Sequence, residues 1–229
     1  MNQAGGTTRA SILIRMSTAD PHARQPVLHS GPDPDAARLT AILVHGRGAS
    51  AEDILGLASE FAVDDVAYLA PQAANHSWYP YTFLAPIAQN EPFLTSALGI
   101  VSGLVRNLDE QGIAPDRVAI LGFSQGACLT LEFAARNPRR YAAIIGLSGG
   151  LIGPPGTPRI YPGSLEGTPA FLGCSDVDPH IPVERVRESA AVLRTMKASV
   201  DDQIYRGMGH TVNGDEIRAV TALLKGTRD

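Results

Sequence analysis

The chain is poor in cysteine, and it lacks both a basic stretch and a long apolar stretch. Cys128 and Cys174 are its two cysteines, and neither lies in a C-x-x-C pattern. Two isolated cysteines do not make a disulfide framework, so we expect free thiols in a reducing cytosol. The formal net charge is -4 and no run of Lys or Arg occurs, which argues against a nucleic-acid partner.

The N-terminal residues lack the features of a signal peptide. Residues 1–10 have neither a basic n-region nor a long apolar h-region. The apolar stretch 11–16 is far too short to span a bilayer. We therefore predict a cytoplasmic protein without a stable membrane anchor. We expect residues 1–16 to be a flexible extension and residues 17–229 to form a single domain, whose oligomeric state, a homodimer included, stays open.

Short apolar stretches alternate with amphipathic ones along most of the chain, as in a series of β-α-β units. Residues 39–44 and 142–147 are apolar on both faces, which is typical of buried parallel strands. Further strands are expected at 66–70, 118–121, 169–173 and 200–205. The sequence predicts an α/β fold with a mostly parallel central sheet and helices on both faces.

A serine motif lies between the strand predicted at 118–121 and an almost wholly apolar helix predicted at 125–137. Residues 122–126 read G-F-S-Q-G, which fits G-x-S-x-G. This is the context of a nucleophile elbow, a sharp strand-to-helix turn that exposes a serine in the α/β-hydrolase fold. Glycines flank the serine because larger side chains would clash in so tight a turn. Ser124 is therefore the candidate nucleophile.

The serine needs a base, because a hydroxyl is a poor nucleophile at neutral pH. In this fold the acid and the histidine follow the serine along the chain, and only His180 and His210 come after Ser124. His210 follows the last predicted strand in a glycine-containing loop, at the edge where sites in open α/β sheets form. His180 lies two residues from Asp178, too close to be both oriented by that acid and placed over the serine. We predict that His210 is the base.

Two aspartates compete for the role of the acid that orients the histidine. Asp176 and Asp178 both follow the strand predicted at 169–173, so position alone does not separate them. Pro179 biases Asp178 towards an extended backbone, which suits a fixed side-chain direction. Asp176 is better placed to hydrogen-bond the backbone two residues further on. We expect one of them to orient the histidine and the other to cap the loop.

Acyl transfer also requires two backbone N–H donors for the oxyanion. One should come from Gln125, the residue after the serine, and the other from the loop after the strand at 39–44. That loop reads H-G-R-G at residues 45–48, and its glycines let the backbone approach a substrate carbonyl. We assign the second donor to the Arg47 N–H, with the Arg47 side chain pointing into solvent. We expect His45 to support the loop.

Together these motifs resemble the carboxylesterase and acyl-protein thioesterase family of α/β hydrolases, also called phospholipase/carboxylesterase-like. The matches run in family order over about residues 39–225. They are L-V-H-G-R-G at 43–48, W-Y at 78–79, G-F-S-Q-G at 122–126, D-P-H-I-P at 178–182 and G-M-G-H at 207–210. The resemblance implies a triad of Ser124, Asp178 and His210, with Arg47 and Gln125 as oxyanion donors. It implies no metal and no organic cofactor.

The segment after Trp78 departs from the family pattern. Pro80 stands where the family usually has Asp, and the residues that follow are unlike those of the thioesterases. Trp78, Phe83 and Ile87 are our candidates for contacts with the acyl group of a substrate, and ordinary packing of this loop is the alternative. Because the segment would border the acyl pocket, the family's substrate cannot be carried over.

The leading hypothesis is a serine esterase that cleaves a small-molecule carboxylic ester through an acyl-enzyme intermediate. An acyl-thioesterase or a lysophospholipase with the same triad is the alternative among enzymes. A third hypothesis is a catalytically silent hydrolase fold that binds a ligand. The intact set of serine, acid, histidine and oxyanion glycines argues against this third hypothesis, although the fold alone would not decide it.

Overall fold

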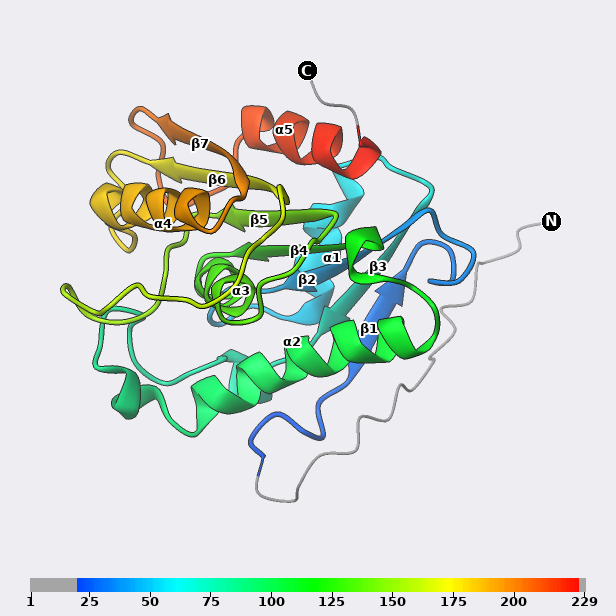
Figure 1. Cartoon of the computed structure of the whole chain (residues 1–229), viewed down its shortest axis with the longest axis horizontal. Helices are drawn as coiled ribbons and strands as arrows, with labels where there is room; N and C mark the ends of the chain where they lie inside the picture. The colour runs from blue at the N-terminus through cyan, green and yellow to red at the C-terminus, as the bar shows by residue number, and fades with distance from the viewer. Residues whose placement is uncertain (1–19, 227–229) are drawn as a thin grey trace.

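The structure is a computed structural model that describes residues 20–226, and within that range seven strands form one sheet (Figure 1). The strand order is β1-β3-β2-β4-β5-β6-β7. The strands are β1 (Val27–Ser30), β2 (Leu39–Val44), β3 (Val66–Pro71), β4 (Val118–Phe123), β5 (Ala143–Leu147), β6 (Pro169–Ser175) and β7 (Ser199–Tyr205). β1 runs antiparallel to β3, and the other neighbouring pairs are parallel. The predicted mostly parallel sheet is confirmed, while the predicted extension 1–16 lies outside the described residues.

Helices cover both faces of the sheet (Figure 1). One face carries α1 (Ala51–Ser59) and α5 (Gly214–Lys225), and the other carries α2 (Phe93–Glu110), α3 (Gln125–Arg136) and α4 (Val183–Thr195). Within β2, Ile42 and Val44 belong to the core under α2, α3 and α4, whereas Ala41 and Leu43 belong to the core under α1 and α5. A parallel strand buried on both faces must be apolar throughout, which explains the composition of β2.

Two of the differences from the sequence expectation concern β1 and β6. β1 is not predicted, because it has only four residues and lies at the sheet edge, where no run of apolar residues marks it. β6 continues to Ser175, two residues beyond the predicted end, and pairs with β7 as far as Tyr205. The longer β6 brings the aspartates that follow it to the carboxyl edge of the sheet, beside the end of β7.

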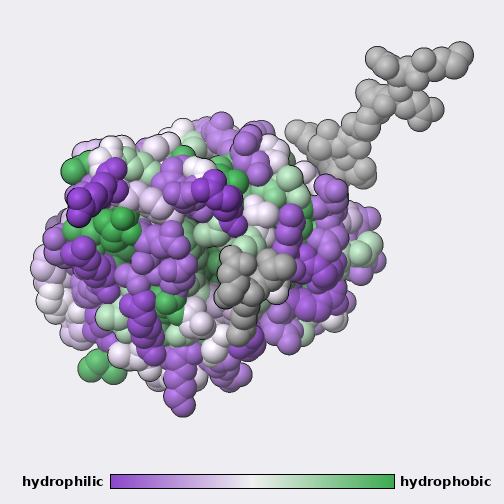
Figure 2. All heavy atoms as spheres, turned by 90° about the horizontal axis from the view of Figure 1, so that it is seen from above, coloured by the Kyte–Doolittle hydropathy of each residue, from purple (hydrophilic) through white to green (hydrophobic). Residues whose placement is uncertain are grey.

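The long segment at residues 72–92 has no regular period and holds two short 3-10 helices, η1 (Ala74–His76) and η2 (Ile87–Asn90). A third, η3 (Pro115–Arg117), precedes β4. Within residues 20–226 no helix is both long enough and apolar enough to cross a membrane. Viewed from above, the surface is mostly hydrophilic, with hydrophobic residues in small patches (Figure 2).

Candidate active site

Ser124 lies at the sharp turn between β4 and α3. Its backbone has φ 55° and ψ -118°, a conformation that strains any residue other than glycine and that is found mostly at active sites. The Ser124 N–H donates to the carbonyl of Leu147 (2.9 Å), so the turn is tied to the neighbouring strand β5. The surrounding sheet therefore holds the strained serine in place.

The two glycines of the motif are required by close backbone contacts. A Cβ at Gly122 would lie 2.2 Å from the carbonyl oxygen of Gly126. A Cβ at Gly126 would lie 2.0 Å from the carbonyl oxygen of Val44, at the end of β2. Any side chain at either position would force the elbow apart from the sheet. The steric reason inferred from the sequence is therefore present in the structure.

His210 lies in the loop between β7 and α5, and its imidazole reaches the serine. Its Nε2 is 2.8 Å from Ser124 Oγ. The ring also contacts the aromatic rings of Phe123 and His180, with centroid distances of 5.0 Å and 4.8 Å. His180 itself is exposed and makes no contact with the serine hydroxyl. Of the two histidines considered, the structure brings His210 to Ser124.

Asp178 completes a continuous chain of hydrogen bonds. Its Oδ2 is 2.7 Å from His210 Nδ1, and its Oδ1 accepts from the backbone N–H groups of His180 (2.8 Å) and Ile181 (3.0 Å). Burial acts to raise the pKa of Asp178, but the hydrogen bonds from His210 and from these N–H groups outweigh it, so the pKa lies below its ordinary value. An ionised Asp178 holds the His210 proton on Nδ1 and leaves Nε2 to accept from the serine.

The second aspartate has a different partner from the one expected. Asp176 does not bond the backbone two residues further on; Asp178 makes that contact, to His180 N–H. Instead, Asp176 Oδ1 accepts from the N–H of Gly207 (2.8 Å), which has φ 65°. The expectation was wrong because β6 is longer than predicted, so Asp176 follows it directly and faces the end of β7. Asp176 thereby braces the loop that carries His210.

The loop after β2 lies directly against the elbow. A Cβ at Gly46 would lie 3.4 Å from the Cβ of Ser124 and 3.3 Å from Cδ1 of Phe123, so a larger residue there would already be in contact with the elbow. His45 is fully buried, donates from Nδ1 to the carbonyl of Gly46 (2.8 Å) and accepts at Nε2 from the N–H of Ala73 (3.1 Å). Burial lowers the pKa of His45, so the ring is neutral, as this pair of contacts requires. The residue supports the loop, as expected.

Arg47 fits the expectation with its backbone N–H but not with its side chain. Its backbone N–H has no acceptor among residues 20–226, so that group is available to a ligand. Its side chain does not point freely into solvent, because the guanidinium donates to the backbone carbonyls of Tyr79, Pro80 and Tyr81. The N–H of Gln125, at the first position of α3, likewise has no acceptor within the helix. Two backbone donors therefore flank Ser124.

The three residues proposed for acyl contacts occupy different depths. Trp78 is fully buried, and its indole N–H donates to the carbonyl of His45 (2.9 Å). Phe83 is 5% exposed, and Ile87 is half-buried against the same core. Trp78 thus lies beneath the segment, whereas Ile87 has surface that a substrate could reach. Three large apolar residues are highly exposed: Tyr81 and Val177, in the loops that follow β3 and β6, and Ile160, in the long loop between β5 and β6.

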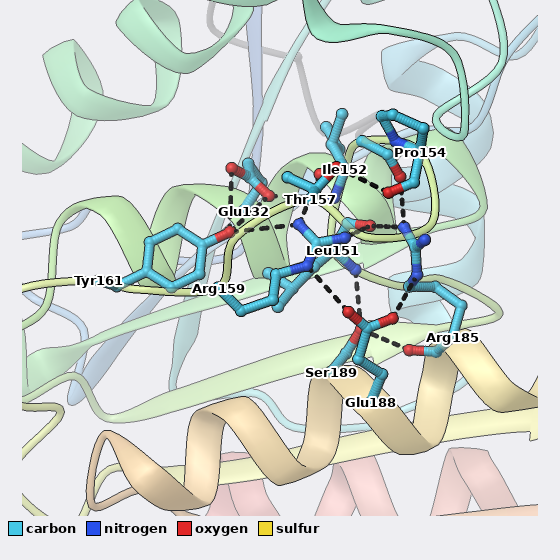
Figure 3. A network of polar contacts seen from close by, with 11 residues as sticks. Glu132, Leu151, Ile152, Pro154, Thr157, Arg159, Tyr161, Arg185, Glu188 and Ser189 are labelled. Atoms are coloured by element: carbon cyan, nitrogen blue, oxygen red, sulfur yellow. Dashed lines mark hydrogen bonds and ion pairs between the residues drawn. The ribbon is translucent and has the colours of Figure 1, made fainter.

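A network of charged and polar side chains ties the loop between β5 and β6 to α3 and α4 (Figure 3). We call it the anchor network, and its members are Glu132, Arg159, Tyr161, Arg185 and Glu188. Arg185 donates to the loop carbonyls of Leu151 (2.7 Å) and Gly153 (2.6 Å) and pairs with Glu188 (2.8 Å).

The other half of the anchor network reaches α3. Arg159 pairs with Glu188 (3.1 Å) and donates to the carbonyl of Ile152 (2.6 Å). Glu132, on α3, accepts from the Ile152 N–H (3.0 Å) and from the Tyr161 hydroxyl (3.3 Å). The loop is thus held by side chains from two helices, on the same face of the sheet as α2.

A cavity of about 330 Å³ lies away from these residues, at the opposite edge of the sheet. It is lined near the amino ends of the strands by residues that include Leu39, Arg117 and Pro169. Ligands in open α/β sheets bind at the carboxyl ends of the strands, so we place the candidate site at the serine rather than in this cavity. Among residues 20–226 no group of three or more potential metal ligands is found.

Residues 26–227 match the family described as phospholipase/carboxylesterase. The chain belongs to this family. A solved phospholipase/carboxylesterase from Dyadobacter fermentans DSM 18053 is 43% identical, with a TM-score of 0.84, covering 88% of this chain and 96% of that one. Acyl-protein thioesterase 1 of Yarrowia lipolytica is 25% identical over 197 residues, covering 78% of this chain and 87% of that protein.

Other relatives match over shorter regions. Acyl-protein thioesterase 1 of Kluyveromyces lactis is 27% identical over 134 residues, which is 57% of this chain and 59% of that protein. The match thus spans less than two thirds of the length of this relative. The matched family is described as phospholipase/carboxylesterase, and these relatives are named phospholipase/carboxylesterase or acyl-protein thioesterase.

Proposed function

We propose that this protein is a serine hydrolase that cleaves small-molecule carboxylic esters, with Ser124 as nucleophile, His210 as base and Asp178 as orienting acid. The observation that carries the proposal is the unbroken hydrogen-bonded chain Asp178–His210–Ser124, with distances of 2.7 Å and 2.8 Å. The strained backbone of the serine adds weight, because such strain persists only where the surrounding structure imposes it.

The proposed reaction follows from the positions of the protons. His210 Nε2 takes the proton of Ser124 Oγ as that oxygen attacks the ester carbonyl, and the imidazolium is stabilised by Asp178. The tetrahedral oxyanion lies against the backbone N–H groups of Arg47 and Gln125. His210 then protonates the leaving alcohol, which departs and leaves an acyl group on the serine. A water molecule, deprotonated by His210, releases the acid and restores the hydroxyl.

The acyl group is proposed to contact the segment from Trp78 to Ile87. Ile87 and Tyr81 offer partly or largely exposed apolar surface there, and Phe83 lies buried beneath. Thioester or lysophospholipid cleavage by the same triad is the alternative, since some relatives are named acyl-protein thioesterases. A catalytically silent fold is disfavoured, because a binding protein has no need for a strained serine joined to a histidine and an acid.

The test is a panel of p-nitrophenyl esters of graded acyl length, acyl-thioesters and lysolipids, assayed with the wild-type protein and with Ser124→Ala. We expect ester turnover that falls by about 10³- to 10⁶-fold in the variant. Turnover of thioesters or lysolipids well above that of esters would favour the alternative. No turnover of any substrate, or equal rates in both proteins, would remove the proposal.

We also propose that the protein acts in the cytoplasm, which its two buried, unpaired thiols support. Fractionation of the host cell tests the location. Size-exclusion chromatography with light scattering tests whether the protein is a monomer or a homodimer.

A further inference from the structure

Both residues with a proposed oxyanion donor also bind one and the same segment with their side chains. We call residues 77–81 the clamped segment. Arg47 donates to three successive carbonyls in it, those of Tyr79 (2.9 Å), Pro80 (2.9 Å) and Tyr81 (2.6 Å), and to the hydroxyl of Ser77 (3.0 Å). A planar guanidinium with five N–H donors suits such a set of acceptors, and a lysine ammonium does not.

Gln125 holds the same segment from the other side of the elbow. Its Oε1 accepts from the N–H of Trp78 (2.9 Å), and its Nε2 donates to the carbonyl of Tyr79 (2.8 Å). Gln125 is 5% exposed, so these buried amide groups need their partners. The carbonyl of Tyr79 therefore accepts hydrogen bonds from the side chains of Arg47 and Gln125 together.

Two histidines fix Trp78, within the clamped segment, from below. The indole N–H of Trp78 donates to the carbonyl of His45, the residue that supports the loop of Arg47. The Trp78 carbonyl accepts from Nε2 of the fully buried His22 (3.1 Å), whose Nδ1 accepts from the N–H of Ala74 (3.0 Å). Because His22 and His45 fix Trp78 in this way, the clamped segment can in turn position Arg47 and Gln125.

We propose that the Arg47 and Gln125 side chains are positioning groups that lock the oxyanion donors to the clamped segment, so that the segment bordering the acyl group and the oxyanion hole move as one unit. This inference rests on the proposed function for its kinetic consequence but not for its structural one. Without the guanidinium, the Arg47 backbone loses its link to three carbonyls, and its N–H is no longer held at one place beside the serine.

The protein contains a single tryptophan, Trp78, which lies inside the clamped segment. Its fluorescence therefore reports on the segment without any need for catalysis. Arg47→Ala and Arg47→Lys are compared with Arg117→Ala, a matched control. Arg117 also donates to backbone carbonyls, those of Ala37 and Arg38, but at the opposite edge of the sheet.

For Arg47→Ala we expect a red-shifted Trp78 emission, stronger quenching by acrylamide and a kcat about 10- to 100-fold lower, less than the effect of deleting a donor outright. KM for an acetyl ester should change by less than about threefold, since the lost term acts in the transition state. Arg47→Lys should behave like Arg47→Ala, and millimolar guanidinium should restore part of the Arg47→Ala activity. Arg117→Ala should show none of these changes.

Each outcome decides the inference. Unchanged Trp78 emission in both Arg47 variants would show that Arg47 does not hold the segment. A changed emission with wild-type kcat would show that the segment is held but is not coupled to the oxyanion hole. If the wild-type protein cleaves no ester, the proposed function fails, and the emission and quenching data still decide whether the clamp exists.

Discussion

Two hydrogen-bonded chains of polar side chains involve α3, one at Ser124 just before its first residue and one at Glu132 within it, and they differ in how they end. The chain from Asp178 through His210 stops at Ser124, which is partly exposed and whose hydroxyl has His210 as its partner. The anchor network instead ends on backbone groups: Glu188 pairs with Arg159 and Arg185, both arginines also donate to loop carbonyls, and Glu132 accepts from the Ile152 N–H and the Tyr161 hydroxyl (Figure 3).

This difference decides whether a buried polar chain contributes to activity or to stability. A chain that ends at a strained, partly exposed hydroxyl can transfer a proton, and we expect conservative replacements of its members to leave the fold intact. A chain that ends on backbone groups has no atom left to react with a substrate. Such a chain fixes the position of the loop that it holds, and removing Arg185 takes a donor from the buried carbonyls of Leu151 and Gly153. Substitutions in the chain that ends at Ser124 should therefore lower mainly activity, and substitutions in the anchor network should lower mainly stability.

The largest effect on kcat is expected from Asp178, the acid of the chain that ends at Ser124. Asp178→Asn should lower kcat by up to about 10⁴-fold, because an amide favours the wrong His210 tautomer. Its melting temperature should change little. Asp176→Asn is the matched control, two residues away on the same loop, and should cost mainly stability, roughly 1 kcal/mol. Measurement of kcat and melting temperature for both variants checks the pair. A near-normal kcat for Asp178→Asn with a collapsed kcat for Asp176→Asn would reverse the assignment.

A substitution in the anchor network should instead lower stability and leave kcat nearly unchanged. Arg185→Met should lower the free energy of unfolding by about 3 kcal/mol, because the buried carbonyls of Leu151 and Gly153 lose their donor, with kcat on acetyl esters within a few-fold of wild type. Arg218→Met is the control, because Arg218 and Asp215 are likewise three residues apart on a helix but lie exposed. That variant should cost less than about 1 kcal/mol.

Urea unfolding of the two arginine variants gives the comparison. Equal losses of stability would mean that the anchor network contributes no more than a surface ion pair. A loss of kcat of about 10³-fold in Arg185→Met, at a temperature where it is folded, would mean that the two chains are not separate in function.

The buried acid Glu216, which belongs to neither chain, should make the stability of the protein depend on pH. Burial raises the pKa of Glu216, at the start of α5, to about 7, and one of its carboxylate oxygens has no partner in residues 20–226. The folded state thus keeps a proton that the unfolded chain loses near pH 4.5. Stability should therefore fall as the pH rises from about 4.5 to about 7, by about 1.4 kcal/mol per pH unit and about 3 kcal/mol in all.

Glu216→Gln mimics the protonated acid and should remove this loss. The measurement is urea unfolding of both proteins between pH 4.5 and 8, and the quantity of interest is the difference between their two curves. Buried histidines such as His22 and His45 titrate in both proteins and cancel in that difference. Parallel curves would contradict the assigned pKa of Glu216.

The smallest expected effect is on acyl-chain preference, and it compares the segment that holds Ile87 with the loop that holds Ile160. Ile87→Ala should lower kcat/KM for long acyl esters relative to acetyl esters by about 1–2 kcal/mol, or roughly tenfold, at about 0.8 kcal/mol per buried CH₂. Ile160→Ala is the control from the loop held by the anchor network, where Ile160 is 89% exposed. An unchanged ranking of acyl lengths in Ile87→Ala would mean that this residue only packs against the core.

Much of the fold and of the site follows from local sequence patterns. The buried strands are continuous apolar stretches, and the elbow of Ser124 is written in its two glycines. Chain order then leaves two histidines, and only His210 follows a strand at the right edge. These features rest on residues close together in sequence, where spacing and sterics are enough.

The remainder depends on contacts between distant residues. Asp176 could not be assigned its partner Gly207, because that contact depends on where β6 ends beside β7. The partners of the Arg47 side chain lie 30 to 34 residues away, and no spacing in the sequence signals them. Such roles follow only from the assembled fold.

Covalent labelling shows whether Ser124 is the nucleophile at the end of the chain Asp178–His210–Ser124. The protein is treated with a fluorophosphonate, digested, and the adduct mapped by mass spectrometry, with Ser124→Ala as control. The account predicts one adduct, on the peptide that contains Ser124, a loss of ester hydrolysis in step with labelling, and no adduct in the variant. An adduct on another residue, or full activity after complete labelling of Ser124, would contradict it.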